Sequence, residues 1–231
     1  MVIGIVGGMG SYATVDLFKR LVDAFPAEKE WDRPRILIDN YCTMPSRVRA
    51  ILYNERREEL CKDLAFSVKH LIESGADKII LACNMSHVFL PEIKQLVPEA
   101  ERTIVDIIDT LANDIHLNNV DEVNLIASEG TIETKIYNSK FARYGITINS
   151  PTEIQYKLLR DFIEAIKQNN LTESIMSSFV KFVDECSTDS VILGCTELPI
   201  LYSECLKSGF KFRKKIFDPL QSTIDLLVSN F

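Results

Sequence analysis

Short apolar runs alternate with longer amphipathic segments along most of the chain. The apolar runs are bounded by polar or turn-forming residues, and their length is typical of buried strands. They occupy residues 2–7, 35–40, 78–83, 103–107, 122–128, 190–195 and 214–218. Apolar positions recur with the period of a helix at residues 11–25, 56–75, 131–145, 153–168 and 219–230. This alternation predicts an α/β fold with parallel sheets.

The two halves of the chain resemble one another. Cys83 and Cys195 each end an apolar run, and they are as far apart in sequence as "IVD" at 104–106 and "IFD" at 216–218. This spacing indicates an internal duplication, and therefore two similar α/β domains. No stretch rich in Gly, Ser or Pro separates the halves, so we expect a tight cleft between the domains. The predicted division assigns 1–100 plus 210–231 to the first domain and 101–209 to the second.

Composition and charge restrict the classes of function. A hydrophobic content of 46% and a charged content of 26% are ordinary for a globular protein. The net charge of −7 disfavours nucleic-acid binding. The apolar N-terminal stretch is too short for a membrane span and lacks a basic leader, so we expect a cytoplasmic protein without membrane association. The 6 cysteines include no C-x-x-C pair, which favours reduced thiols over disulfides or a metal site.

The positions of Cys83 and Cys195 predict chemistry. Ligands of open parallel sheets bind beyond the carboxyl ends of the strands, where both cysteines are expected. A helix beginning after each strand would stabilise a thiolate, lowering the thiol pKa below roughly 8.5. A thiolate and a thiol on opposite sides of a substrate are equipped to remove a proton from one face of a carbon and return one to the other. Either cysteine alone would be read as a small buried residue, as are Cys42, Cys61, Cys186 and Cys205.

Four motifs carry a family resemblance: "GGMGSYAT" (7–14), "CNMSH" (83–87), "ASEGT" (127–131) and "GCTEL" (194–198). Their order and spacing resemble the aspartate/glutamate racemase family, in particular its aspartate racemase branch. The resemblance implies two pseudosymmetric Rossmann-like (flavodoxin-like) domains with an active-site cleft between them. It also implies a homodimer that racemises an acidic amino acid, aspartate or alternatively glutamate, with Cys83 and Cys195 as acid and base. No cofactor, pyridoxal phosphate, metal or nucleotide is expected.

The resemblance also assigns substrate-binding residues. Asn84 and Thr196 follow the two cysteines and are expected to hold the α-carboxylate. Arg47 in "PSR" matches the arginine that binds the side-chain carboxylate, a task suited to its bidentate geometry. Lys167 lies where this branch tends to place a second cation.

Three further positions belong to the expected binding site. Thr131 is a candidate carboxylate donor, and Met9 lies in a glycine-rich loop whose backbone is expected to approach the ligand closely. Met85 stands where the family usually has Thr, which removes one hydroxyl donor.

Two other functions fit parts of the sequence. Gly8 to Ala13 form the pattern G-x-G-x-x-A after a predicted strand, with Asp39 at the end of the next strand. This pattern is typical of an NAD(P)-binding oxidoreductase, but it leaves both cysteine motifs unexplained. A non-catalytic amino-acid-binding protein on the same scaffold is the other alternative, although both thiols are retained.

Overall fold

The computed structural model describes residues 1–231. The chain divides into two compact units: unit 1 comprises residues 1–107 and 223–231, and unit 2 comprises residues 108–222. Each unit contains a 4-stranded parallel sheet with helices, which confirms the predicted α/β class. None of the helices combines the length and the hydropathy that a membrane span requires.

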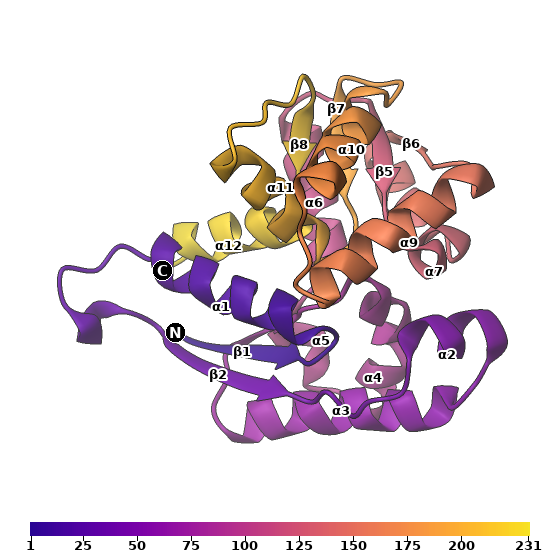
Figure 1. Cartoon of the computed structure of the whole chain (residues 1–231). Helices are drawn as coiled ribbons and strands as arrows, with labels where there is room; N and C mark the ends of the chain where they lie inside the picture. Colours follow the sequence, from indigo (N-terminus) through magenta and orange to yellow (C-terminus); the bar gives the residue numbers. More distant parts are fainter. The chain divides into compact units, whose positions relative to one another are not determined.

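Unit 1 is built on a sheet with the strand order β2-β1-β3-β4. Its strands are β1 (Val2–Gly7), β2 (Arg35–Asn40), β3 (Lys78–Leu81) and β4 (Ile104–Val105). Its helices are α1 (Ser11–Ala24), η1 (Glu30–Asp32), α2 (Arg47–Tyr53), α3 (Arg57–Glu73), η2 (Asn84–Phe89), α4 (Leu90–Leu96) and α5 (Ala100–Thr103), where η marks a 3₁₀ helix. Figure 1 shows α1 over one face of this sheet and α3 over the other.

The packing of α3 follows from its apolar spacing. Leu60, Leu64, Val68 and Leu71 recur at intervals of three or four residues and are all buried. They belong to one core cluster with Ile79 of β3. Burial of each such side chain contributes roughly 1.5–3 kcal/mol to stability, so this one helix face fixes α3 on the sheet.

Unit 2 has the strand order β6-β5-β7-β8. Its strands are β5 (Glu122–Ile126), β6 (Thr147–Asn149), β7 (Ser190–Leu193) and β8 (Lys215–Phe217). Its helices are α6 (Ile107–Leu117), α7 (Glu129–Glu133), α8 (Ile136–Phe141), η3 (Ala142–Tyr144), α9 (Glu153–Lys167), α10 (Glu173–Asp184) and α11 (Leu198–Lys207); α12 (Pro219–Ser229) begins in this unit and ends in unit 1.

The two sheets share one topology. In each, the first strand in sequence lies between the second and the third, and the fourth lies at the far edge. A cysteine follows the third strand in both units, Cys83 after β3 and Cys195 after β7. This repetition is the outcome that a duplicated α/β unit predicts.

The domain boundary and one edge strand differ from the sequence predictions. The predicted division grouped residues 210–231 with the first domain, whereas β8 pairs with β7 in the second sheet and only residues 223–231 lie in unit 1. The strand β6 was not predicted, because three residues are too few to show an alternating pattern. It occupies the edge beside β5.

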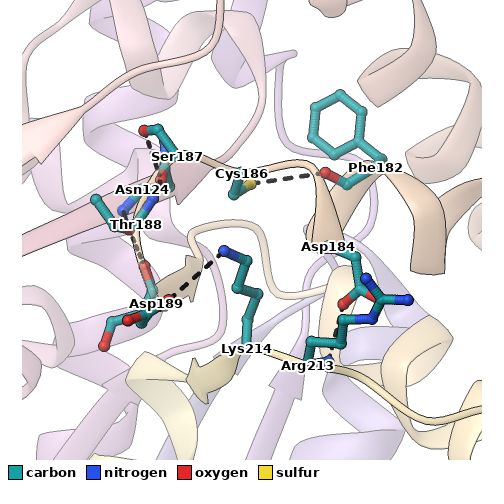
Figure 2. Close-up of polar contacts among 10 residues, drawn as sticks. Asn124, Phe182, Asp184, Cys186, Ser187, Thr188, Asp189, Arg213 and Lys214 are labelled. Carbon is teal, nitrogen blue, oxygen red and sulfur yellow. Dashed lines mark hydrogen bonds and ion pairs between the residues drawn. The ribbon is translucent and has the colours of Figure 1, made fainter.

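A polar network ties the loop before β7 to the middle of β5 (Figure 2). The Oδ1 atom of Asn124 accepts hydrogen bonds from the Thr188 backbone N–H (2.8 Å), the Thr188 hydroxyl (2.8 Å) and the Ser187 hydroxyl (3.2 Å). The Asn124 backbone N–H donates in turn to the Thr188 hydroxyl (3.0 Å). Because the loop enters β7 at its amino end, the network fixes the start of the strand whose other end leads to Cys195.

Candidate active site

Cys83 lies just beyond the carboxyl end of β3. Its side chain is buried, and its backbone is extended where the chain enters η2. The chain turns sharply here, because the Cys83 N–H bonds to the Leu81 carbonyl at 2.7 Å. The helix after Cys83 is a short 3₁₀ helix, and the α-helix after Cys195 begins only at Leu198. The stabilisation of a thiolate by helix dipoles is thus weaker than the sequence suggested.

His87 anchors the Cys83 backbone. It is buried, its Nδ1 atom lies 3.0 Å from the Cys83 carbonyl, and its Nε2 atom accepts a hydrogen bond from the Ile107 backbone N–H at 3.3 Å. Since Nε2 is the acceptor, Nδ1 carries the proton and donates to Cys83. His87 is therefore a neutral positioning residue for the strand end.

Met9 joins the glycine-rich loop to the segment after Cys83. The Ser86 hydroxyl lies 3.0 Å from the Met9 sulfur, and both side chains are buried. The Met9 carbonyl accepts a hydrogen bond from Arg47 Nη2 at 3.0 Å. Gly8 makes this loop possible, because its φ is +81° and a Cβ there would lie 2.5 Å from the Tyr41 backbone.

Arg47 is the cation of unit 1's candidate site. Its Nη1 atom donates to the Pro45 carbonyl at 3.4 Å, which with the Met9 contact holds the guanidinium in place. Its Nε atom is shielded from solvent and has no hydrogen-bond partner. A buried N–H without an acceptor costs roughly 1–3 kcal/mol, more on a charged group, and a bound carboxylate would remove that cost.

Cys195 has an immediate acid partner. Its thiol donates to the Oε2 atom of Glu197 at 2.9 Å, and the Thr196 hydroxyl lies 3.4 Å from the same oxygen. The exposed fractions of Cys195 and Glu197 are only 8% and 3%. A carboxylate this buried requires donors, and the thiol is one of them.

Lys167 ends α9 close to this pair. Its Nζ atom bonds to Glu164 at 2.9 Å. Burial lowers the pKa of Lys167, but the hydrogen bond to Glu164 and the negative charge of Glu197 outweigh burial and raise that pKa above its ordinary value. Lys167 therefore stays an ammonium ion near the Cys195 thiol.

The remaining predicted residues follow β5 in unit 2 and β3 in unit 1. Thr131 is buried in α7, after β5, and its hydroxyl lies 3.0 Å from the Ser128 hydroxyl. Asn84 is buried directly after Cys83, and Met85 packs partly buried against the unit 1 core.

Each unit thus gathers its own group of predicted residues. Unit 1 brings Met9 and Arg47 together with the segment 83–86, and unit 2 brings Lys167 and Thr196 to Cys195. Glu197 was not among the predicted site residues. An acidic residue inside the largely apolar segment "GCTELPIL" could have indicated it. No cluster of three or more His, Cys, Asp or Glu side chains has the proximity needed for metal binding.

Comparison with known proteins gives consistent matches. The profile of the family described as Asp/Glu/Hydantoin racemase matches residues 6–227. The broad specificity amino-acid racemase RacX of Bacillus subtilis (strain 168) is 26% identical over 205 residues, which are 85% of each chain. These matches cover both cysteine motifs.

Solved structures share the fold. The aspartate racemase of Picrophilus torridus superposes with a TM-score of 0.83 at 24% identity, covering 99% of this chain and 93% of its own. The glutamate racemase of Francisella tularensis subsp. tularensis SCHU S4, in complex with D-glutamate, gives a TM-score of 0.68 at 20% identity, covering 99% and 80%. At these identities the likeness shows the fold, and it includes proteins with two different substrates.

Proposed function

Because the chain belongs to the Asp/Glu/Hydantoin racemase family, we propose that it racemises an acidic amino acid without pyridoxal phosphate. Aspartate is the first candidate substrate and glutamate the second. The observation that carries the proposal is the repeated placement of a buried cysteine after the third strand of each sheet. The matched relatives give no support to an NAD(P)-dependent oxidoreductase or to a non-catalytic binding protein.

The proposed reaction uses the two sulfur atoms as acid and base. One thiolate takes the α-proton, breaking the Cα–H bond and forming an S–H bond. The other thiol gives its proton to the opposite face of the resulting carbanion, and the roles reverse for the other enantiomer. Each acid–base group of this kind contributes about 10²–10⁴ in rate. The scheme requires both sulfur atoms to reach the same carbon.

Glu197 gives Cys195 a route for its proton. When Cys195 must act as the base, the thiol proton passes to Glu197 Oε2, 2.9 Å away, and leaves a thiolate beside a carboxylic acid. When Cys195 acts as the acid, the carboxylate holds the thiol oriented until the proton is transferred. Glu197 is thus a positioning and proton-holding residue, and Cys83 has no comparable carboxylate partner.

Two cationic side chains, Arg47 and Lys167, favour a substrate with an acidic side chain. Arg47 has an unpaired Nε atom, and Lys167 carries its charge near Cys195, so both are assigned to substrate carboxylates. The polar side chains of Asn84 and Thr196, next to the cysteines, are assigned to the α-carboxylate. Hydrogen-bond donors placed where charge develops typically lower a barrier by roughly 3–4 kcal/mol each.

The test is an assay of purified protein with L-aspartate, L-glutamate and L-alanine, without added cofactor. Loss of optical rotation should be fastest with aspartate, slower with glutamate and negligible with alanine. Activity on alanine equal to that on both acidic amino acids would contradict the role of the cations. No racemisation of any amino acid would refute the proposed function.

A further inference from the structure

Thr14, near the start of α1, makes two hydrogen bonds to the glycine-rich loop between β1 and α1 (Figure 1). Its hydroxyl oxygen accepts a hydrogen bond from the Gly8 backbone N–H at 3.0 Å, and its hydroxyl proton is donated to the Gly10 carbonyl, also at 3.0 Å. Because Gly8 precedes Met9 and Gly10 follows it, one side chain holds the loop on both sides of Met9.

Packing fixes the Thr14 side chain in this position. Thr14 is only 4% exposed. A Cβ at Gly7, the last residue of β1, would lie 2.5 Å from the Thr14 Cγ2 atom and 2.6 Å from its hydroxyl oxygen. Gly7 therefore leaves the room that the Thr14 side chain occupies.

The bond to Gly8 distinguishes Thr14 from an ordinary helical threonine. Threonine hydroxyls in helices commonly donate to the carbonyl four residues earlier. Thr103 makes this bond with the Glu99 carbonyl at 3.0 Å, as Thr14 does with the Gly10 carbonyl. The Thr14 hydroxyl also accepts the Gly8 N–H, and it thereby ties α1 to a loop residue outside the helix.

Met9 connects this loop to the cation of unit 1's candidate site. The Met9 carbonyl accepts a hydrogen bond from Arg47 Nη2 at 3.0 Å, whereas the second anchor of the guanidinium, the Pro45 carbonyl, is 3.4 Å from Nη1. At these distances the bond to Met9 is the stronger one. The direction of the Arg47 guanidinium, including its buried and unpartnered Nε atom, therefore depends on where the Met9 carbonyl lies.

We propose that Thr14 is a positioning residue that sets the affinity of the site for acidic substrates. Thr14 fixes the Met9 carbonyl, this carbonyl holds the guanidinium of Arg47, and the guanidinium binds the side-chain carboxylate of the substrate. Thr14 acts only through the loop, because its hydroxyl is already bonded to Gly8 and Gly10. The inference rests on the proposed function, since it concerns the binding of the same substrate.

The bond also explains the pattern G-x-G-x-x-A from Gly8 to Ala13. In a dinucleotide-binding loop, the backbone approaches the phosphates closely and its N–H groups face them. In this chain the Gly8 N–H is bonded to Thr14 instead. The first glycine of the pattern therefore serves the structure of the loop itself.

Two substitutions at position 14 separate the hydroxyl from the shape of the side chain. Thr14→Val keeps the branched shape without the hydroxyl, and Thr14→Ser keeps the hydroxyl without the methyl group. Thr14→Val should raise KM for aspartate about tenfold with a smaller effect on kcat, because Arg47 loses its fixed anchor. Thr14→Ser should restore a KM near the wild-type value. The matched control Thr103→Val loses only the bond to the Glu99 carbonyl and should leave both constants unchanged.

A double-mutant cycle tests whether Thr14 acts through Arg47. In the Arg47→Lys background, Thr14→Val should raise KM by less than about twofold, because the guanidinium fork that Thr14 positions is already lost. Two effects that multiply would show that Thr14 acts independently of Arg47 and would contradict the proposal.

Two measurements on the full-length protein do not depend on turnover. Amide hydrogen exchange at Gly8 should be about tenfold or more faster in Thr14→Val than in the wild type, in Thr14→Ser or in Thr103→Val. Calorimetric titration with L-aspartate should give a dissociation constant about tenfold higher for Thr14→Val than for the wild type.

The outcomes separate this inference from the proposed function. A wild type that binds aspartate without racemising it would refute the proposed function, and weaker binding by Thr14→Val would still support the role of Thr14. Unchanged exchange at Gly8, or unchanged aspartate affinity in folded Thr14→Val, would overturn the inference. A Thr14→Ser variant as impaired as Thr14→Val would also overturn it, because the effect would then come from packing against Gly7.

Discussion

Replacement of Glu197 by Gln removes the negative charge beside the Cys195 thiol without changing the side-chain volume. In the wild type, the thiol donates to Glu197 Oε2 at 2.9 Å, and both groups are almost fully buried. The Gln amide oxygen still accepts a hydrogen bond, so Cys195 keeps a neutral partner. The Gln amide does not take up the thiol proton at neutral pH.

The expected fall in kcat has two causes: the hydrogen-bond acceptor of the thiol loses its charge, and Cys195 loses its proton acceptor. A hydrogen bond to a charged group contributes about 1.5–3 kcal/mol and a neutral one about 0.5–1.5 kcal/mol. The difference of roughly 1–1.5 kcal/mol corresponds to about a tenfold change in rate. Loss of the proton acceptor adds up to the 10²–10⁴ of a general base. We therefore expect Glu197→Gln to lower kcat for aspartate racemisation by at least about tenfold.

The assay compares kcat and KM for L-aspartate and D-aspartate by polarimetry. Because Glu197 is the partner of the Cys195 thiol, kcat should fall more in the direction in which Cys195 is the base. The matched control is Glu164→Gln, which removes the carboxylate bonded to Lys167 but leaves the thiol untouched. This control should keep nearly wild-type kcat.

Two results would refute the reasoning. One is a Glu197→Gln variant with unchanged kcat and a normal circular dichroism spectrum. The other is a Glu164→Gln variant impaired as strongly as Glu197→Gln, which would trace the effect to Lys167.

Three further predictions concern binding and stability. Arg47→Lys should raise KM for aspartate about tenfold or more with a smaller effect on kcat, because the guanidinium fork is lost; steady-state kinetics test this, with Arg49→Lys as the unaffected control. Asn124→Ala should lower the free energy of unfolding in urea by about 2–3 kcal/mol, since several donors lose their acceptor. Asn149→Ala, which loses one exposed bond, should cost under about 1 kcal/mol. Burial raises the pKa of Cys186 and of Cys205 to about 11; because the unfolded thiols ionise at lower pH, stability should fall as pH rises from about 9 to about 11, and less so in Cys205→Ala.

Most of the fold could be predicted from the sequence, because most of its strands are continuous apolar runs. Residues 2–7 and 35–40 form β1 and β2 with the predicted bounds. The predicted strand at 78–83 ends at Leu81, because the chain turns at Cys83. The strand β6 could not be predicted from its own residues, because it is a strand only through its pairing with β5.

The candidate site could be predicted only in part from the sequence. Both cysteines were found because each interrupts an apolar run at its end. The contact of Arg47 with the Met9 carbonyl joins residues 38 positions apart, and no local pattern encodes it. The partnership of Glu197 with the Cys195 thiol likewise depends on a side-chain direction within a turn, which sequence spacing alone does not fix.

The most direct test of the central claim is aspartate racemisation in deuterated water, stopped at low conversion. With two thiols on opposite faces, D-aspartate formed from L-aspartate should carry deuterium at Cα, while the remaining L-aspartate stays protonated. The variants Cys83→Ala and Cys195→Ala should each form no product. A product that retains the substrate's own proton, or a single-cysteine variant with full activity, would contradict the account.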